Sequence, residues 1–181
     1  QFEVYNHATQ QGAGVGRLKY RDITGDGRID EDDRCIIGDP NVDLSASLNL
    51  DLHWKQWTMS MFFTGDFGFD IYNMTKKQLD FFSYGNATTN RGANTLNAWT
   101  PNNRTATIPA LSVTDDNNEM RMSTYYIEDG SYFKMKYVKL TYALPQAICN
   151  KIFASSFNIF GQVENIFTIT DYSGLDPEIS V

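Results

Sequence analysis

Cations, histidine and long apolar runs are scarce in this sequence, and each scarcity excludes a class of protein. The 181 residues contain 15 lysines and arginines against 22 acidic residues, and the net charge of −7 argues against a nucleic-acid-binding protein. No run of 18 apolar residues occurs, which excludes a transmembrane helix. The same absence is compatible with a membrane β-barrel, whose strands are weakly hydrophobic on average.

Cysteine is scarce as well. Cys35 and Cys149 are far apart and lack the spacing of a metal site. We interpret both as structural or incidental thiols, because a disulfide framework needs more cysteines. The sequence begins at Gln1, with neither methionine nor a signal peptide, so we expect a piece of a longer chain or a processed one.

Aromatic residues, by contrast, are abundant. Phe, Tyr and Trp make up 14% of the chain, and 13 glycines accompany many Asn and Thr residues. This composition suits strands and turns better than helices. With 41% hydrophobic residues, the chain makes at most one domain, which either buries a core or walls part of a barrel.

Residues 44–64 alternate between apolar and polar side chains. Every second residue from Leu44 to Leu52 is apolar, and the alternation resumes at Trp57 with Met59, Met61 and Phe63. A period of two predicts strands, and the short interval between the two runs predicts an antiparallel hairpin. Each run has about the 9–11 residues that a tilted strand needs to cross a bilayer. Trp54 and Trp57 flank the turn, where a barrel carries an aromatic girdle.

Two further spanning strands are expected at residues 134–144 and 157–170, joined by a short connection. Residues 76–122 lose the alternation, and a connection this long is usually functional or disordered. Outer-membrane barrels place long loops outside the cell and short turns in the periplasm, so residues 66–126 are expected outside. Shorter strands are expected at residues 18–20 and 35–37.

Residues 22–33 match the spacing of a twelve-residue calcium loop. Gly27 occupies the sixth position, where the backbone turns sharply. Oxygen ligands are expected from six residues: Asp22, Thr24, Asp26, Arg28 through its carbonyl, Asp30 and Asp33. Thr24 is a neutral ligand and Asp33 is shorter than the usual glutamate, so we expect a weak site suited to extracellular calcium. The alternative is an acidic, solvated turn whose Gly and Asp residues serve only local geometry.

An ordered series of short motifs carries a family resemblance over nearly the whole chain. The motifs are 22–30, 37–41, 61–65, 70–73, 99–103, 108–110, 127–136, 142–145, 164–168 and 172–178. In this order they resemble the C-terminal third of the SusC/RagA group of TonB-dependent outer-membrane transporters. One stretch departs modestly: many members read Gly-Gln-Asn-Leu-Phe where this chain has Gly-Gln-Val-Glu-Asn-Ile-Phe at 161–167.

The resemblance implies an all-β fold, with antiparallel strands forming part of a transmembrane β-barrel with long extracellular loops. Residues 1–181 then form a C-terminal segment of that barrel in the outer membrane of a Gram-negative, Bacteroidetes-type bacterium. Its implied partners are a SusD-like surface lipoprotein, the TonB complex through absent parts of the chain, outer-membrane lipid, and glycan or peptide cargo. The implied function is nutrient import without catalysis.

Four aromatic residues of the long loop are candidates for cargo contact, because aromatic faces stack on sugar rings and peptide side chains. They are Phe81, Phe82, Tyr84 and Trp99. The alternative role is packing of the loop against itself or against the lipoprotein.

Two other functions are weighed against import. A secreted soluble β-sandwich that binds carbohydrate and holds one structural calcium explains the alternation, but not the ordered motifs. A glycosidase using Asp30 or Glu31 has little support, since the loop spacing accounts for these carboxylates. Neither His7 nor His53 has a recognisable catalytic partner, and no catalytic residue is assigned.

Overall fold

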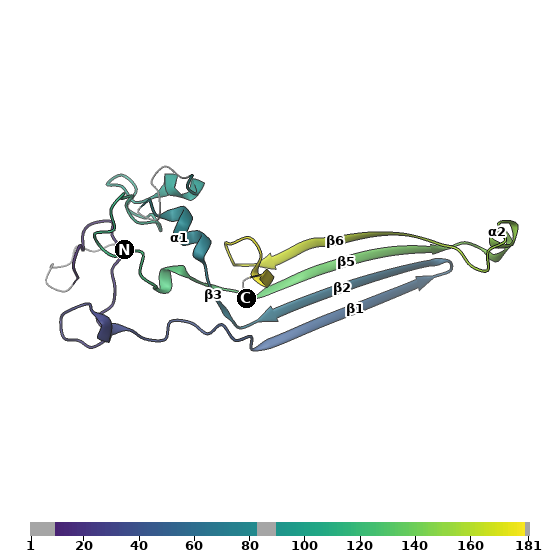
Figure 1. Cartoon of the computed structure of the whole chain (residues 1–181), viewed down its shortest axis with the longest axis horizontal. Helices are drawn as coiled ribbons and strands as arrows, with labels where there is room; N and C mark the ends of the chain where they lie inside the picture. Colours follow the sequence, from purple (N-terminus) through teal and green to yellow (C-terminus); the bar gives the residue numbers. More distant parts are fainter. Residues whose placement is uncertain (1–9, 83–89, 180–181) are drawn as a thin grey trace. The chain divides into compact units, whose positions relative to one another are not determined.

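The computed structural model describes residues 10–82 and 90–179, which divide into two compact units (Figure 1). The sheet unit comprises residues 39–71 and those from 128 onward. The loop unit comprises the residues up to 38 together with residues 72–127. Each unit is described by itself.

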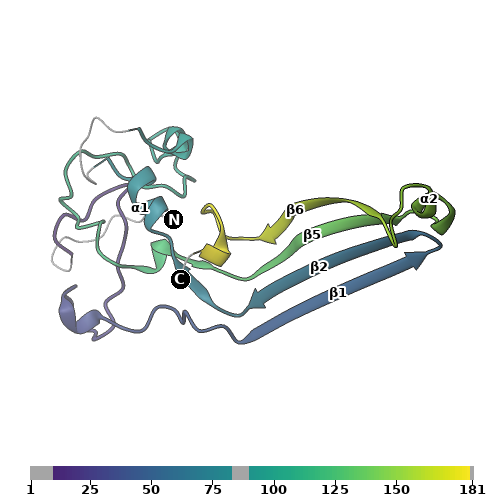
Figure 2. The same cartoon turned by 45° about the vertical axis from the view of Figure 1, so that its right-hand side comes forward.

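Four long antiparallel strands form the sheet unit. They are β1 (Leu44–Trp54), β2 (Trp57–Phe67), β5 (Tyr132–Ala143) and β6 (Asn158–Thr170), in the spatial order β1-β2-β5-β6. The spatial order of the four strands is therefore the same as their order in the sequence. Two views show the four strands side by side (Figures 1 and 2). The predicted hairpin and the two predicted later strands are confirmed, within a few residues at their ends.

The β1–β2 connection and the β5–β6 connection lie at the same end of the sheet (Figure 1). Lys55 and Gln56 alone join β1 to β2, and Lys55 adopts a left-handed backbone with φ of 54°. The short helix α2 (Gln146–Lys151) lies between β5 and β6. The Ala143 amide donates to the Gln56 carbonyl (2.8 Å), which ties the turn to the end of β5.

The strand register separates the side chains onto two faces. One row across the sheet is Leu50, Met61, Val138 and Val163, and the next is Asp51, Ser60, Lys139 and Gln162. Paired residues point to the same face of a sheet, so apolar and polar rows alternate between the faces. The register shifts between Met135 and Tyr137 of β5, where a bulge preserves this separation.

The loop unit has little regular structure. It contains helix α1 (Met74–Asp80) and 3-10 turns at Glu31–Asp33, Ala93–Asn97 and Thr124–Tyr126. Asn73 caps α1 by accepting from the Lys76 amide. A two-stranded sheet of β3 (Asp70–Tyr72) and β4 (Ile127–Asp129) lies where the chain passes from one unit to the other.

The short strands predicted at residues 18–20 and 35–37 are wrong. The Leu18 carbonyl accepts from the side chains of Gln10 (2.8 Å) and Asn117 (2.9 Å), and its amide donates to Glu119 (2.9 Å). Because side chains satisfy this backbone, no partner strand is needed. Ile36 is 94% exposed and has no buried face to pair with a sheet.

In the described part of the chain, no helix combines the length and the apolar character needed to cross a membrane. Most regular structure consists of antiparallel strands, in agreement with the all-β fold expected from the sequence.

Candidate functional site

The apolar face of the sheet carries exposed side chains on all four long strands. Leu44 is 60% exposed, Val163 62% and Ile169 64%. Further large apolar residues on the same face are exposed too: Leu48, Leu50, Leu52, Trp54, Trp57, Phe133, Leu140, Ile159 and Phe167. No second sheet and no helix of the sheet unit covers these described side chains. A contiguous apolar surface of this size marks contact with a partner or with lipid.

The opposite face is mainly polar and internally hydrogen-bonded, with Phe62, Tyr137 and Phe160 among its side chains. Ser60 donates to Asp51 across the β1–β2 pair, and His53 is 3.0 Å from the Thr58 hydroxyl. Lys139 lies over the ring of Phe160, 4.5 Å from its centroid. These groups are those of a surface in contact with water rather than with hydrocarbon.

An ionic cluster lies on the polar face, at the end of the sheet away from α2. The Lys134 ammonium donates to Asp176 (2.7 Å) and Glu178 (2.9 Å), and Lys136 also donates to Glu178. The Lys134 side chain is only 5% exposed. Hydrogen bonds from Lys136 and Lys134 lower the pKa of Glu178.

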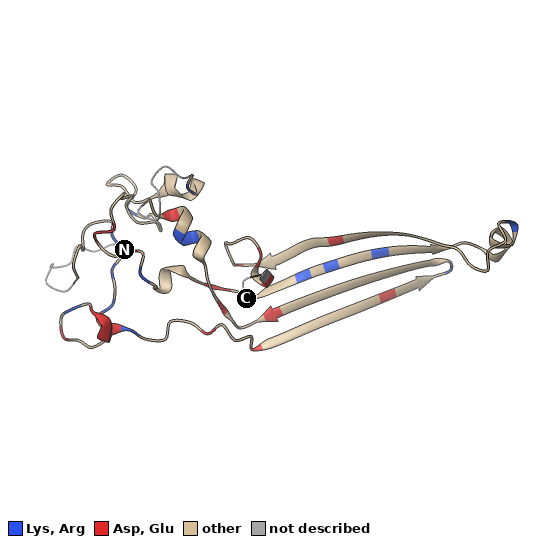
Figure 3. Cartoon of the chain, in the orientation of Figure 1, with Lys and Arg blue, Asp and Glu red and all other residues tan. Residues whose placement is uncertain are grey.

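The ionic cluster fixes the segment after β6 onto the sheet. Sequence reasoning missed it, although the two lysines on β5 and the acidic residues of the 172–178 motif carried the signal. Figure 3 shows the lysines as blue bands along β5.

Buried polar side chains organise the core of the loop unit. Asn117 is fully buried and accepts from Gln10 (2.6 Å), while Arg17 pairs with the buried Glu119 (2.9 Å). Tyr126 is also fully buried, donates to the Glu119 carbonyl (2.7 Å), and has a pKa raised by desolvation. This core holds together segments about 100 residues apart in the sequence.

The candidate cargo residues have different surroundings. Phe81 is 6% exposed and packs against the rings of Tyr125 (5.6 Å) and Tyr126 (5.9 Å), so in this arrangement it supports the loop unit and has no free face. The Arg91 guanidinium lies 5.4 Å from the ring centroid of Phe82. Tyr84 lies outside the described residues.

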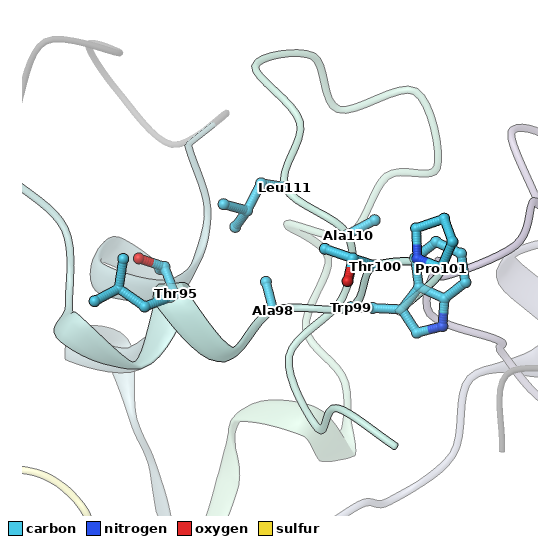
Figure 4. Close-up of a pocket in the computed structure, with 8 residues that line it drawn as sticks. Thr95, Ala98, Trp99, Thr100, Pro101, Ala110 and Leu111 are labelled. Atoms are coloured by element: carbon cyan, nitrogen blue, oxygen red, sulfur yellow. The ribbon is translucent and has the colours of Figure 1, made fainter. Parts of the chain in front are cut away.

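Trp99 lines a shallow pocket with a cavity volume of about 430 Å³. The pocket is lined mainly by apolar groups of the 95–101 segment and of Ala110 and Leu111, with hydroxyls from Thr95 and Thr100 (Figure 4). The backbone of Gly16 packs so closely on the indole that an added Cβ would lie 2.4 Å from it. The close packing on Gly16 and the hydrogen bond from the Trp99 amide to the Ile108 carbonyl therefore hold the indole at the pocket.

The predicted calcium loop is held by carboxylates that accept from its own backbone. Asp22 accepts from the amides of Gly25 (2.6 Å) and Gly27 (2.9 Å), and both glycines have positive φ. Asp33 accepts from the amides of Ile23 (2.8 Å), Thr24 (3.1 Å) and Asp30 (3.0 Å), and these bonds lower its pKa. Within the described residues, no three acidic, histidine or cysteine side chains converge as metal ligands.

Comparison with known proteins places this sheet and loop arrangement in a class. No family model matches the chain. TonB-dependent receptor P3 of Formosa agariphila is 35% identical over 159 residues, covering 88% of this chain and 15% of the relative. TonB-dependent receptor SusC of Bacteroides thetaiotaomicron is 24% identical over 179 residues, covering 98% of this chain and 17% of the relative.

A solved structure of the RagAB peptide transporter is similar in fold, with a TM-score of 0.67 and 25% identity, and the match covers 84% of this chain and 16% of that one. The chain thus spans about a sixth of the length of its relatives. It fits a C-terminal part of a SusC/RagA-type TonB-dependent transporter, which confirms the resemblance. Receptors of this class are outer-membrane proteins of Gram-negative Bacteroidetes, in agreement with the expected location.

Proposed function

We propose that this chain supplies wall strands and extracellular loops of the transmembrane β-barrel of a TonB-dependent nutrient importer. The observation that carries the proposal is the uncovered apolar face of β1, β2, β5 and β6, backed by a hydrogen-bonded polar face. In a barrel the first face meets lipid and the second lines the lumen. A soluble sandwich requires a second sheet over the apolar face, so this observation favours the membrane.

The strand dimensions and connections agree with a barrel wall. The four strands have 11, 11, 12 and 13 residues, enough to span about 30 Å of hydrocarbon when tilted. β1 and β6 are the edges of the described sheet, and in a closed barrel each pairs with a further strand of the transporter. The short connections at the α2 end are then periplasmic, and the loop unit is extracellular.

A charge on the apolar face tests this proposal most simply. In the complete transporter, Leu50→Arg places a guanidinium in lipid at a cost of about 2–4 kcal/mol, whereas the adjacent Asn49→Arg points into the lumen. We expect Leu50→Arg to lower the amount of folded transporter in the outer-membrane fraction and Asn49→Arg to leave it unchanged. Equal yields for both variants, or a detergent-free soluble monomer, would contradict the proposal.

For cargo, the proposal is a glycan or peptide fragment delivered with a SusD-like surface lipoprotein and energised through TonB, without catalysis by this chain. The name of the similar RagAB peptide transporter supports peptide import, and the name SusC supports the receptor class. Among the described candidates, Trp99 lines a pocket whose cavity volume of about 430 Å³ supports a role in holding a side chain or a sugar ring.

Replacement of Trp99 tests the cargo site. Trp99→Ala removes the stacking surface and is expected to reduce uptake of the cognate cargo several-fold, because one aromatic contact contributes about 0.5–1.5 kcal/mol beyond its buried area. The buried Phe81 is a poor control, since its loss disturbs the loop itself. Uptake per surface-exposed transporter should therefore be compared with that of Val113→Ala, an exposed residue of the loop unit that does not line this pocket. Unchanged uptake in Trp99→Ala would remove this residue from the site.

We further propose that residues 22–33 bind calcium weakly. The loop offers hard oxygens, and Asp22 already gathers the Gly25 and Gly27 amides around itself. Calcium titration of the transporter by calorimetry, with Asp22→Ala as the comparison, should show one weak site that the substitution removes. Identical heats for parent and variant would leave the loop as an Asp-rich turn.

A further inference from the structure

The α2 end of the sheet carries apolar side chains that extend past the strands. We define the α2 end as the β1–β2 turn, helix α2 and the residues that follow it to Phe157. Ile148 is 46% exposed, Ile152 51% and Phe153 99%. Leu144 donates its amide to the Phe157 carbonyl (2.9 Å), which continues the β5–β6 ladder and places Phe157 beside Ile159 on the apolar face.

Phe153 is unusual in its backbone as well as in its exposure. It follows the helix with φ of 56°, a left-handed conformation that favours glycine and is strained for a bulky residue. The Ala154 amide nevertheless closes the turn by donating to the Cys149 carbonyl (3.0 Å). A strained backbone that presents an entire aromatic ring to the outside indicates a ring with a partner beyond this chain.

The charge of the α2 end identifies that partner. Residues 52–65 and 144–163 contain Lys55 and Lys151 and not a single acidic residue, although the chain as a whole has a net charge of −7. In Figure 3 the turn and the α2 region show blue and no red. The Lys55 ammonium lies 4.8 Å from the ring centroid of Trp54, and Trp57 packs on Tyr142 at 4.6 Å. Cations beside exposed aromatic and aliphatic groups form a surface that binds the anionic interface of a membrane.

We propose that the α2 end is an interfacial anchor: Phe153 and Ile152 insert among the lipids, while Lys55 and Lys151 bind the phosphates of anionic phospholipid headgroups. This inference rests on the proposed barrel, because it extends the lipid-facing surface of the sheet by one connection. It adds a specific lipid partner and assigns a role to α2, which sequence reasoning treated only as a connection. The alternative binding partner of the α2 end is a periplasmic protein, and the test below distinguishes it from lipid.

Site-directed spin labelling tests the insertion. A nitroxide is attached at Phe153→Cys, at Val163→Cys on the apolar face, or at Gln162→Cys on the polar face, in the complete transporter with its other cysteines replaced by serine, in lipid nanodiscs. We expect the labels at positions 153 and 163 to collide preferentially with oxygen and the label at 162 with a water-soluble nickel complex. A label at 153 that matches 162, while 163 stays in lipid, overturns the anchor and leaves the barrel standing. Nickel access at 163 overturns both.

A second measurement addresses the lysines and does not alter Phe153. The immobilised fraction of spin-labelled phosphatidylglycerol relative to phosphatidylcholine is compared for the parent, for Lys55→Gln with Lys151→Gln, and for the matched control Lys77→Gln in the loop unit. Each lysine near an anionic surface changes binding about fivefold at low ionic strength. The double variant should lose most of the preference for the anionic lipid and the control should keep it. An unchanged preference in the double variant would overturn the headgroup site.

Discussion

The sheet unit and the loop unit are stabilised in opposite ways. Backbone ladders hold β1, β2, β5 and β6 together, and no second layer of the unit covers the side chains of one face. Individual polar side chains hold the loop unit, such as the Gln10–Asn117 pair that joins residues 107 positions apart. A ladder tolerates the loss of any one side chain, whereas a loop depends on a few of them.

The largest expected effect follows from removing a central polar side chain of the loop unit. Asn117→Ala leaves Gln10, the Leu18 carbonyl and Glu119 without one of their partners in a buried site. Unsatisfied buried groups cost about 1–3 kcal/mol each, so we expect a local loss on the order of 3 kcal/mol. Hydrogen exchange should accelerate in residues 10–20 and 115–121 and stay unchanged in the four long strands.

Asn94→Ala, at an exposed position of the 93–97 turn, is the control and should change nothing. Faster exchange in β1, β2, β5 or β6 upon Asn117→Ala would contradict the separation of the two units.

A pair of glycines sharpens the comparison within the sheet. A Cβ at Gly65 would lie 2.7 Å from the Tyr132 carbonyl oxygen, whereas at Gly161 nothing lies within 4 Å. Gly65→Ala is expected to destabilise the transporter by about 1–3 kcal/mol through overpacking, and Gly161→Ala to be neutral or slightly stabilising. Urea unfolding in detergent measures both. Unchanged stability of Gly65→Ala would show that β2 and β5 can move apart to accommodate the Cβ, and would contradict this prediction.

The ionic cluster on the polar face gives a smaller, pH-dependent effect. Glu178→Gln weakens the contacts to Lys134 and Lys136 and should cost about 1 kcal/mol, because Glu178 and Lys136 are partly exposed. The pKa of Glu178 is lowered from 4.5, so its contribution is present above that value and is lost as the pH falls through the lowered pKa.

Hydrogen exchange of residues 171–179 measures the effect of Glu178→Gln. The variant should exchange faster at pH 7, and the difference from the parent should disappear in acid. A difference that persists below the lowered pKa would show that charge is not what holds this segment.

The sheet was predictable from the sequence because its side chains alternate over whole strands. Val138, Leu140 and Tyr142 share a face with Met61, Met59 and Trp57, as the alternation predicted. The bulge near Lys136 was not predicted, although it changes the phase of the alternation: the apolar face carries Phe133 and Met135 before the bulge and Val138 after it.

The structure of the loop unit could not be predicted from the sequence, for a physical reason. Residues 18–20 look like a strand, but distant side chains satisfy their backbone groups, and nothing in the local pattern reveals a partner 99 residues away. Phe81 and Trp99 looked equivalent in the sequence, whereas one is a core residue and the other lines a pocket. The calcium loop and its six ligands remain predictions.

Accessibility along β6 tests the lipid-facing surface most directly. Nitroxide labels placed one at a time at residues 159–163 of the transporter in nanodiscs should alternate, with oxygen access at 159, 161 and 163 and nickel access at 160 and 162. Such a period of two is expected only if one face meets lipid and the other meets water. Uniform nickel access at all five positions would contradict the account.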